Sequence, residues 1–423
     1  MSRMHRSISY LRVVAVYCVL IVLFDSTAQA AGLSLAAAEE LALASDPGVR
    51  SIQAKKLALE EMSVAAEQLP DPMLKLGLVA LPTDTFNLGQ EAMTQAQVGL
   101  VQKFPRGKSR SLRSTQTHLQ SEGLDKAAAD KQLQIRLAVR EQYLEVLKQQ
   151  ELARINADAI TAFSDVADIT KDYYATGRLH QQAVLQASVE LARVEDRSTR
   201  IAQDEEQART RLTTWIGDAA YRDLDAAWPE FSPLPSGVTI EEKLTRHPRI
   251  LALQKNISAA DTGVELARQR YKPEFALDVT YGGRGGNNPD GSPRTDLLSL
   301  MVVMDIPLFT SNRQDKFVAA QVAESSAVTY IRDDVLRRMR SEADFHLATF
   351  HRQKQRIELF ENTLLPDAAF SSQASLEAFQ SSIEDLTTLL RTRITEFDLQ
   401  LEHARLRAEL LKTRARLQYL EGV

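Results

Sequence analysis

The chain has 423 residues, of which 25% are charged and 44% hydrophobic, and its formal net charge at pH 7 is −5. This acidic balance argues against a nucleic-acid partner, because nucleic acids select basic surfaces. The only cysteine is Cys18, near the N-terminus. The remainder of the chain can therefore hold no disulfide, thiolate metal site or cysteine nucleophile.

Residues 1–30 have the plan of a secretory signal peptide. Three arginines precede an apolar run at residues 13–24, and Ala28-Gln29-Ala30 offers small residues for cleavage before Ala31. The run is about 12 residues long, which is too short to span a bilayer as a helix. Since no later stretch is apolar for about 18 residues, an exported chain would be either soluble in the periplasm or inserted as β-strands.

Prolines indicate that the rest of the chain is an internal duplication, with an offset of about 200 residues between the copies. The matched pairs are Pro47 with Pro248, Pro72 with Pro273, and Pro105 with Pro307. The predicted domains are the signal peptide (1–30), a first repeat (31–217), an inter-repeat linker (218–238) and a second repeat (239–423).

Each repeat should contain two amphipathic strands, each beginning or ending near one of the duplicated prolines. In residues 275–281, Phe, Leu, Val and Tyr alternate with Ala, Asp and Thr, so one face is apolar and the other is small or polar. Runs of about 9–11 residues with this period have the length of a tilted membrane strand. A hairpin on a soluble sheet would show the same alternation. The predicted strands cover about 72–81, 94–105, 273–282 and 297–307.

Long helices should follow each strand pair. From Ser109 to Tyr173 the chain lacks proline and has one glycine, which predicts a single helix of about 65 residues with a coiled-coil tendency. Gly177 interrupts the pattern, so an antiparallel helical hairpin is expected over about 109–216. The second repeat predicts a similar hairpin over about 311–421, with its turn near Ser381 and Ser382.

Four strands cannot close a barrel, and unpaired backbone groups at an open edge cost several kcal/mol each in hydrocarbon. The chain should therefore oligomerise, and three copies would supply twelve strands. The expected fold class is mainly α with membrane β.

A family resemblance rests on the duplicated arrangement, the LPDP (69–72) and QKFPRGK (102–108) junctions and the YxxG tip at Tyr174–Gly177. These features resemble the TolC family of outer-membrane efflux proteins over essentially the whole chain after residue 30. The resemblance implies a homotrimer with a 12-stranded barrel in outer-membrane lipid and an α-helical barrel in the periplasm. It also implies a passive duct, without enzymatic activity or cofactor, that partners an inner-membrane RND-type pump and a periplasmic adaptor protein.

Within that family, residues 69–108 resemble outer components of heavy-metal pumps of the cobalt-zinc-cadmium and copper-silver type. A multidrug or type I secretion duct of the same fold is an alternative. A non-conducting periplasmic coiled-coil scaffold is a further alternative from another functional class.

The two hairpin tips carry the candidate functional residues. The candidates for contact with the adaptor are Tyr174, Gly177, Arg178 and Ser382. At the second tip the family often has a YxxG turn followed by entrance aspartates, whereas this chain has Phe379-Gln380-Ser381-Ser382. The candidates for the channel entrance or gate are Glu384, Asp385, Phe379 and Arg391.

Arg391 stands where the family has one of those aspartates. Three copies of Glu384 and Asp385 near a common axis would form a cation-attracting ring. A solvated helix turn is the alternative reading of this acidic pair.

Enzyme and metal motifs are weak in this sequence. Gly107-Lys108-Ser109 resembles the end of a phosphate loop, but Gln102 stands where that motif needs glycine. The histidines form no HExxH motif. No catalytic residue, metal ligand or cofactor site is predicted.

Overall fold

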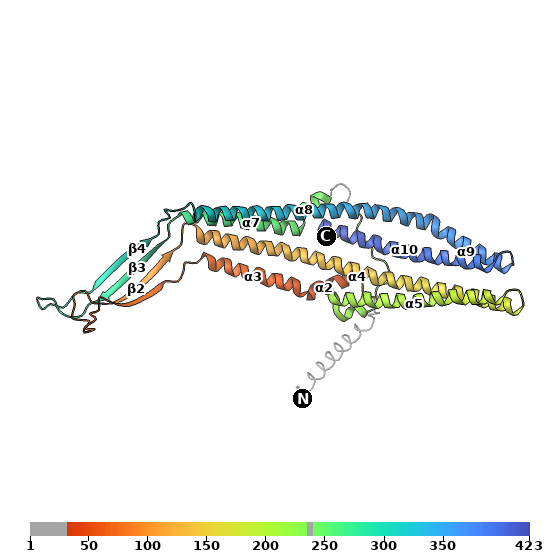
Figure 1. Cartoon of the computed structure of the whole chain (residues 1–423), viewed down its shortest axis with the longest axis horizontal. Coiled ribbons are helices and arrows are strands. Elements are labelled where there is room, and N and C mark those ends of the chain that lie inside the picture. Colours follow the sequence, from red (N-terminus) through yellow and green to blue (C-terminus); the bar gives the residue numbers. More distant parts are fainter. Residues whose placement is uncertain (1–31, 235–239) are drawn as a thin grey trace, which may run out of the picture. The chain divides into compact units, whose positions relative to one another are not determined.

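The computed structural model describes residues 32–234 and 240–423, which form two compact units (Figure 1). The first unit comprises residues 32–46, 134–234 and 346–417, and the second comprises 47–133, 240–345 and 418–423. The predicted signal peptide lies outside the described residues, as do residues 235–238 of the predicted linker.

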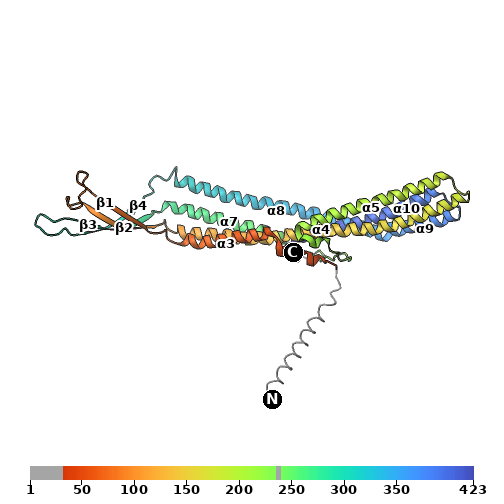
Figure 2. The same ribbon diagram turned by 90° about the horizontal axis from the view of Figure 1, so that it is seen from below.

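The second unit contains one antiparallel sheet in the order β1-β2-β3-β4 (Figure 2). Its strands are β1 (Met73–Val79), β2 (Gln95–Phe104), β3 (Phe275–Gly283) and β4 (Leu297–Met304). All four predicted strands are present, within a few residues of the predicted bounds.

The register of the sheet puts the apolar side chains on one face. Leu74 lies opposite Leu100, which lies opposite Val279, which lies opposite Leu300. Because side chains alternate along a strand, Lys75, Gly99 and Thr280 then share the other face. Leu300 is 70% exposed and Leu76 is 71% exposed. The predicted faces are confirmed, and the apolar one is not covered by the described chain.

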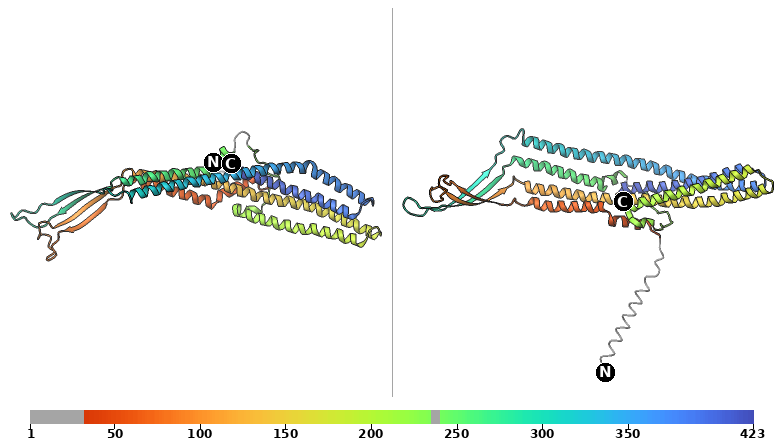
Figure 3. Two further views of the ribbon diagram at one scale, coloured as in Figure 1. Left: turned by 45° about the horizontal axis from the view of Figure 1, so that its top comes forward. Right: turned by 60° about the horizontal axis from the view of Figure 1, so that its bottom comes forward.

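Four helices of the second unit lie beside one another. They are α3 (Pro47–Glu67), the first part of α4 (Ser109–Ala175), α7 (Pro248–Arg268) and the first part of α8 (Gln314–Leu359). A Cβ added at Gly263 of α7 would meet Gln116 of α4 and Gln321 of α8, so α7 lies between these two helices (Figure 3). The short α6 (Ile240–Thr245) precedes α7, and a 3₁₀ turn (Gln269–Tyr271) joins α7 to β3.

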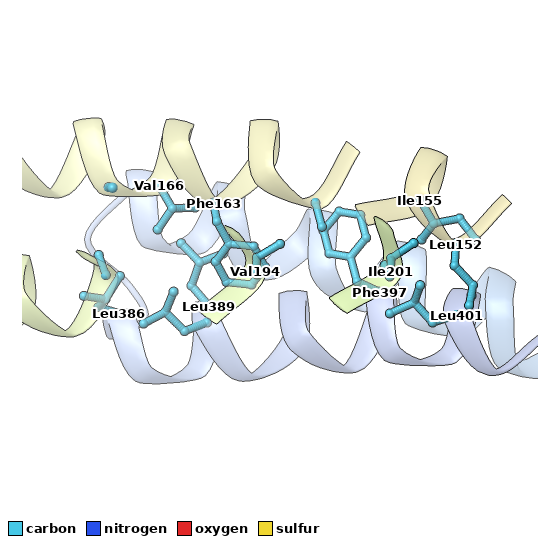
Figure 4. Close-up of a cluster of buried hydrophobic side chains, with 14 of the residues drawn as sticks. Leu152, Ile155, Phe163, Val166, Val194, Ile201, Leu386, Leu389, Phe397 and Leu401 are labelled. Carbon is cyan, nitrogen blue, oxygen red and sulfur yellow. The ribbon is translucent and has the colours of Figure 1, made fainter. Parts of the chain in front are cut away.

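The first unit is built from two helical hairpins. The second part of α4 pairs with α5 (Gln181–Ile216), and α9 (Leu365–Gln380) pairs with α10 (Leu386–Glu421). Their buried faces share one core, in which the rings of Phe163 and Phe397 lie 6.2 Å apart (Figure 4). The remaining helix is α2 (Leu35–Ser45). The predicted hairpins and the long first helix are confirmed.

The arm of the second hairpin that precedes its turn is interrupted just before Pro366. Helix α8 ends at Leu359, and a π-helical turn covers Phe360–Leu364 before α9 begins. Pro366 cannot donate a backbone hydrogen bond and disfavours the standard helical pattern before it. The N–H of Leu365 bonds instead to the carbonyl of Phe360, five residues back, which is the π-helical spacing.

None of the helices within residues 32–234 and 240–423 combines the length and the apolar character needed to cross a membrane.

Candidate functional site

The first hairpin tip is a tight turn that depends on glycine. Helix α4 ends at Ala175, and Gly177 adopts φ +74°, a left-handed conformation that glycine tolerates best. The N–H of Arg178 closes the turn on the carbonyl of Tyr173 at 2.7 Å. Tyr174 is half exposed on the outside of this turn. The sequence therefore located the turn correctly.

The two tips are held together by contacts between their side chains. Arg178 donates from Nη2 to Oγ of Ser382 at 2.7 Å, and its guanidinium carbon lies 4.3 Å from the ring centroid of Tyr173. The hydroxyl of Tyr173 donates to the carbonyl of Gln380 at 3.1 Å. The ring of Tyr173 also packs against Phe379, with centroids 5.7 Å apart. Two of the predicted tip residues, Arg178 and Ser382, are thus in direct contact.

The second tip presents an apolar side chain that sequence reasoning missed. Ser382 has φ +60°, and the next N–H, from Ile383, closes the turn on the carbonyl of Ala378 at 2.8 Å. The Ile383 side chain is 80% exposed. An isoleucine within a predicted turn between serines and acids was the available signal.

Phe379 and Arg391 differ in their placement. Phe379 is 3% exposed and belongs to the helical core, so within one chain it supports the tip and does not form a surface. Arg391 is exposed on the first turns of α10.

The predicted acidic pair makes local hydrogen bonds. Asp385 accepts the N–H of Thr388 at 2.8 Å, as the residue that caps helix α10. This hydrogen bond lowers the pKa of Asp385, and the nearby charge of Arg391 lowers it further. Glu384 accepts a hydrogen bond from the Ser375 hydroxyl at 2.6 Å. Both carboxylates remain exposed, so each combines a structural contact with access to solvent.

The polar face of the sheet carries an ion pair between strands that are not neighbours. Lys75 Nζ on β1 lies 3.0 Å from Asp278 Oδ2 on β3, and Thr280 donates to Asp278 Oδ1 at 2.5 Å. The intervening strand β2 presents Gly99 between them, where a Cβ would collide with the Thr280 hydroxyl. The absence of a side chain at Gly99 therefore leaves room for this polar cluster.

Across the described residues, no three His, Cys, Asp or Glu side chains gather closely enough to hold a metal ion.

Comparisons with known proteins agree with this geometry. Residues 239–423 match the sequence model of the family described as "Outer membrane efflux protein". This match covers the predicted second repeat. No curated protein matches the sequence.

Solved structures match nearly the whole chain at low sequence identity. The chain is similar to CusC, from a study of transmembrane channel formation, with TM-score 0.76 and 14% identity over 91% of this chain and 91% of that chain. It is similar to the outer membrane protein VceC of Vibrio cholerae, with TM-score 0.74 and 15% identity over 92% and 96%. It is also similar to the CmeC outer membrane channel of Campylobacter jejuni, with TM-score 0.75 and 11% identity over 92% and 85%.

Identities this low establish the fold, and the sequence match adds the family pattern in one repeat. The chain therefore has the TolC-type fold of outer-membrane efflux channels, and its second repeat carries the sequence pattern of the outer membrane efflux protein family.

Proposed function

We propose that the protein is the outer-membrane channel of a tripartite efflux system and acts as a passive exit duct. The observation that carries this proposal is the sheet, whose apolar face is exposed while its opposite face holds the ion pair of Lys75 and Asp278. In water this arrangement would leave a large apolar surface uncovered. In a bilayer the apolar face would meet lipid and the polar face would line a water-filled lumen.

The open edges of the sheet support a trimer. Strands β1 and β4 end the sheet on its two sides, and hydrocarbon offers no hydrogen bonds to their outer backbone groups. Pairing of β4 with β1 of the next copy would satisfy both edges. Three copies would give a closed ring of twelve strands, a size known for membrane barrels.

The helical tips would meet the other components of the system. We assign contact with the periplasmic adaptor to Tyr174, Gly177, Arg178 and Ser382, and we add Ile383 because of its exposure. An inner-membrane RND-type pump would supply the energy for transport. The helical hairpins would then lie in the periplasm.

Glu384 and Asp385 remain our candidates for a cation-attracting entrance, together with Phe379 and Arg391. Their exposed carboxylates support this role, whereas the cap that Asp385 forms on α10 and the hydrogen bond of Glu384 with Ser375 offer a purely structural explanation. The double variant Glu384→Gln, Asp385→Asn separates the two roles, because asparagine is also a good helix cap. In planar bilayers it should lower cation preference or alter conductance. Unchanged conductance and selectivity would leave only the structural role.

Heavy-metal cations are our preferred cargo, on the strength of the resemblance carried by residues 69–108. Deleting the gene should then sensitise cells to cobalt, zinc, cadmium, copper or silver more than to dyes and detergents. Sensitivity to hydrophobic drugs with unchanged metal tolerance would keep the duct and assign it to a multidrug system. Loss of secretion of a protein substrate would assign it to a type I system.

The duct itself is tested by fractionation and conductance. The mature protein should sediment with outer membranes, run as a trimer in mild detergent and form channels in planar bilayers. A monodisperse monomer that is extracted without detergent and conducts nothing would instead support the periplasmic scaffold.

A further inference from the structure

A cavity of about 550 Å³ lies in the second unit, where α4, α7 and α8 meet the ends of the strands. Its lining is strongly basic, with four arginines and a single carboxylate, that of Glu274. The arginines are Arg106, Arg113, Arg270 and Arg313. They come from segments far apart in the sequence that the fold brings together.

Only one of these arginines is neutralised. Arg106 pairs with Asp305 and lies 3.5 Å from Glu274. The guanidinium groups of Arg113 and Arg313 make no hydrogen bond or ion pair within the part of the chain that the structure describes. The Arg270 guanidinium carbon lies 3.4 Å from the ring centroid of Phe317, a stacking contact that leaves its N–H groups free to donate. The cavity therefore holds a surplus of positive donors.

A buried amide lines the cavity, and its oxygen has no hydrogen-bond partner in the described chain. It belongs to Gln314, which is only 6% exposed. A buried polar atom without a partner costs about 1–3 kcal/mol. As placed, this oxygen is an acceptor, which a deprotonated oxyanion cannot satisfy. Rotation of the amide exchanges its oxygen and nitrogen, and the amide can then donate to an anion.

Two helix ends add to the positive potential. Helix α4 begins at Ser109 and helix α8 at Gln314, and both residues line the cavity. The N-terminus of a helix carries a partial positive charge and favours anions.

The cavity lies on the polar side of the sheet. By strand alternation, Glu274 and Asp305 share the side of Ala276 and Val303, which is also the side of Asp278. Arg106 contacts both of these acids, so it lies on that side as well. If the protein is the proposed duct, the cavity faces the lumen.

We propose that this cavity binds a soluble oxyanion: the phosphate group of a solute, with other oxyanions of similar size as weaker ligands. Arginine is suited to this ligand because its planar N–H groups can grip two oxygens at once. In a trimer the three cavities would form a positive belt. Anions would be concentrated there, and a cationic cargo would pass together with counter-anions. The position of this belt in a lumen rests on the proposed function, but binding by the single chain does not.

Calorimetry of the full purified protein in non-ionic detergent tests the site, with inorganic pyrophosphate as the probe at low ionic strength. We expect Arg113→Gln, Arg313→Gln to weaken binding at least tenfold. The matched control is Arg337→Gln, Arg338→Gln, which removes two exposed arginines paired with Asp334 on α8. The control should leave the affinity within about twofold, since distant surface charges are largely screened.

A second variant, Gln314→Leu, changes no charge and removes only the buried amide. It should weaken pyrophosphate binding at least threefold while preserving the helical circular dichroism. The proposal is overturned if the wild type does not bind pyrophosphate, if the control loses as much affinity as the cavity variant, or if Gln314→Leu binds like the wild type. Conductance without binding would overturn this inference alone, and binding without conductance would overturn the duct alone.

Discussion

The sheet and the helical core differ in how far they bury large apolar side chains. In the first unit, Leu389 is fully buried and Phe163 is 2% exposed, each packed between helices. In the second unit, Leu298, Leu300 and Val302 each leave more than two thirds of their surface uncovered along a single strand. One region completes its own apolar packing, while the other has an apolar face that the described chain leaves uncovered.

This difference separates two sources of stability. The helical core gains from burial within the chain, at about 25 cal/mol per Å² of apolar surface. The sheet gains from hydrogen bonds within the chain, but its apolar face contributes only once lipid or detergent covers it. Substitutions in the two regions should therefore respond differently to the surrounding medium.

The largest effect is expected for Phe163→Ala in the helical core. Removing a buried ring should lower the free energy of unfolding by about 3–5 kcal/mol. Leu300→Ala in the sheet should lower it by less in detergent, because that side chain packs little within the chain and its removal leaves no cavity there. Thermal unfolding of both variants, followed by far-UV circular dichroism, measures the contrast. Equal losses would show that the sheet is packed as a core.

The next largest effect is expected for a charge introduced on the apolar face of the sheet, and a smaller one for a charge on the polar face. In the proposed membrane duct, Leu300→Arg would place a charge toward lipid, at a cost of about 2–4 kcal/mol near the middle of the bilayer. Met301→Arg changes the neighbouring residue, which points to the polar face, and should cost less. The yield of trimer in outer membranes reports the difference. If Met301→Arg were the more damaging variant, the assignment of faces would be reversed.

The polar face has its own steric constraint at Gly99. A Cβ there would collide with the Thr280 hydroxyl, so Gly99→Ala should displace Thr280 from Asp278 and cost about 1–3 kcal/mol. Gly77 lies on the same face with nothing within 4 Å of an added Cβ, so Gly77→Ala is the matched control. The temperature at which the detergent-solubilised protein loses its assembled state should fall for Gly99→Ala only. Identical behaviour of the two variants would argue against the role given to Gly99.

The smallest effect concerns pH and a buried histidine in the second unit. Burial lowers the pKa of His247, against the opposing influence of its hydrogen bond to the Tyr419 carbonyl and of the Asp130 carboxylate 4.0 Å away. Its Nδ1 accepts the N–H of Arg249, so the neutral ring caps helix α7.

The folded state disfavours the protonated ring of His247. The contribution of the neutral ring to the free energy of unfolding is therefore complete above about pH 6.5 and declines as the pH falls toward the lowered pKa. One proton limits the slope to about 1.4 kcal/mol per pH unit. His247→Asn keeps a capping acceptor, so it should reduce the loss of unfolding free energy at low pH. Urea unfolding at several pH values measures this loss. The exposed His118 serves as the control, and His118→Asn should keep the wild-type pH dependence. A wild-type slope in His247→Asn would assign the decline to other groups.

The architecture was predictable because its signals are periodic. Alternation over residues 275–281 set the strand and its faces, and the scarcity of glycine and proline after Ser109 set the long helix. Gly177 marked the first turn, since its positive φ is the conformation that glycine tolerates best.

Features that depend on packing were not predictable from one sequence. The burial of Phe379, a gate candidate, depends on the turn, which directs its ring toward Tyr173. Pro366 marks a break in the helix, but the sequence does not show that the backbone accommodates it by a π-helical turn at Phe360–Leu364. The basic cavity is lined by Arg113, Arg270 and Arg313. These arginines lie far apart in the sequence, so no local sequence pattern reveals the cavity.

The pairing of β2 with β3 also determines how the chain must reach its folded state. Phe104 lies opposite Phe275, although roughly 170 residues separate them, whereas β1 with β2 and β3 with β4 are local hairpins. Local hairpins close quickly and distant pairs slowly, so the two halves should form their strands before they join. Until then each half presents unpaired strand edges beside exposed leucines, a combination that favours aggregation. Until the two halves join, the newly made chain would therefore benefit from a chaperone that covers these edges and leucines.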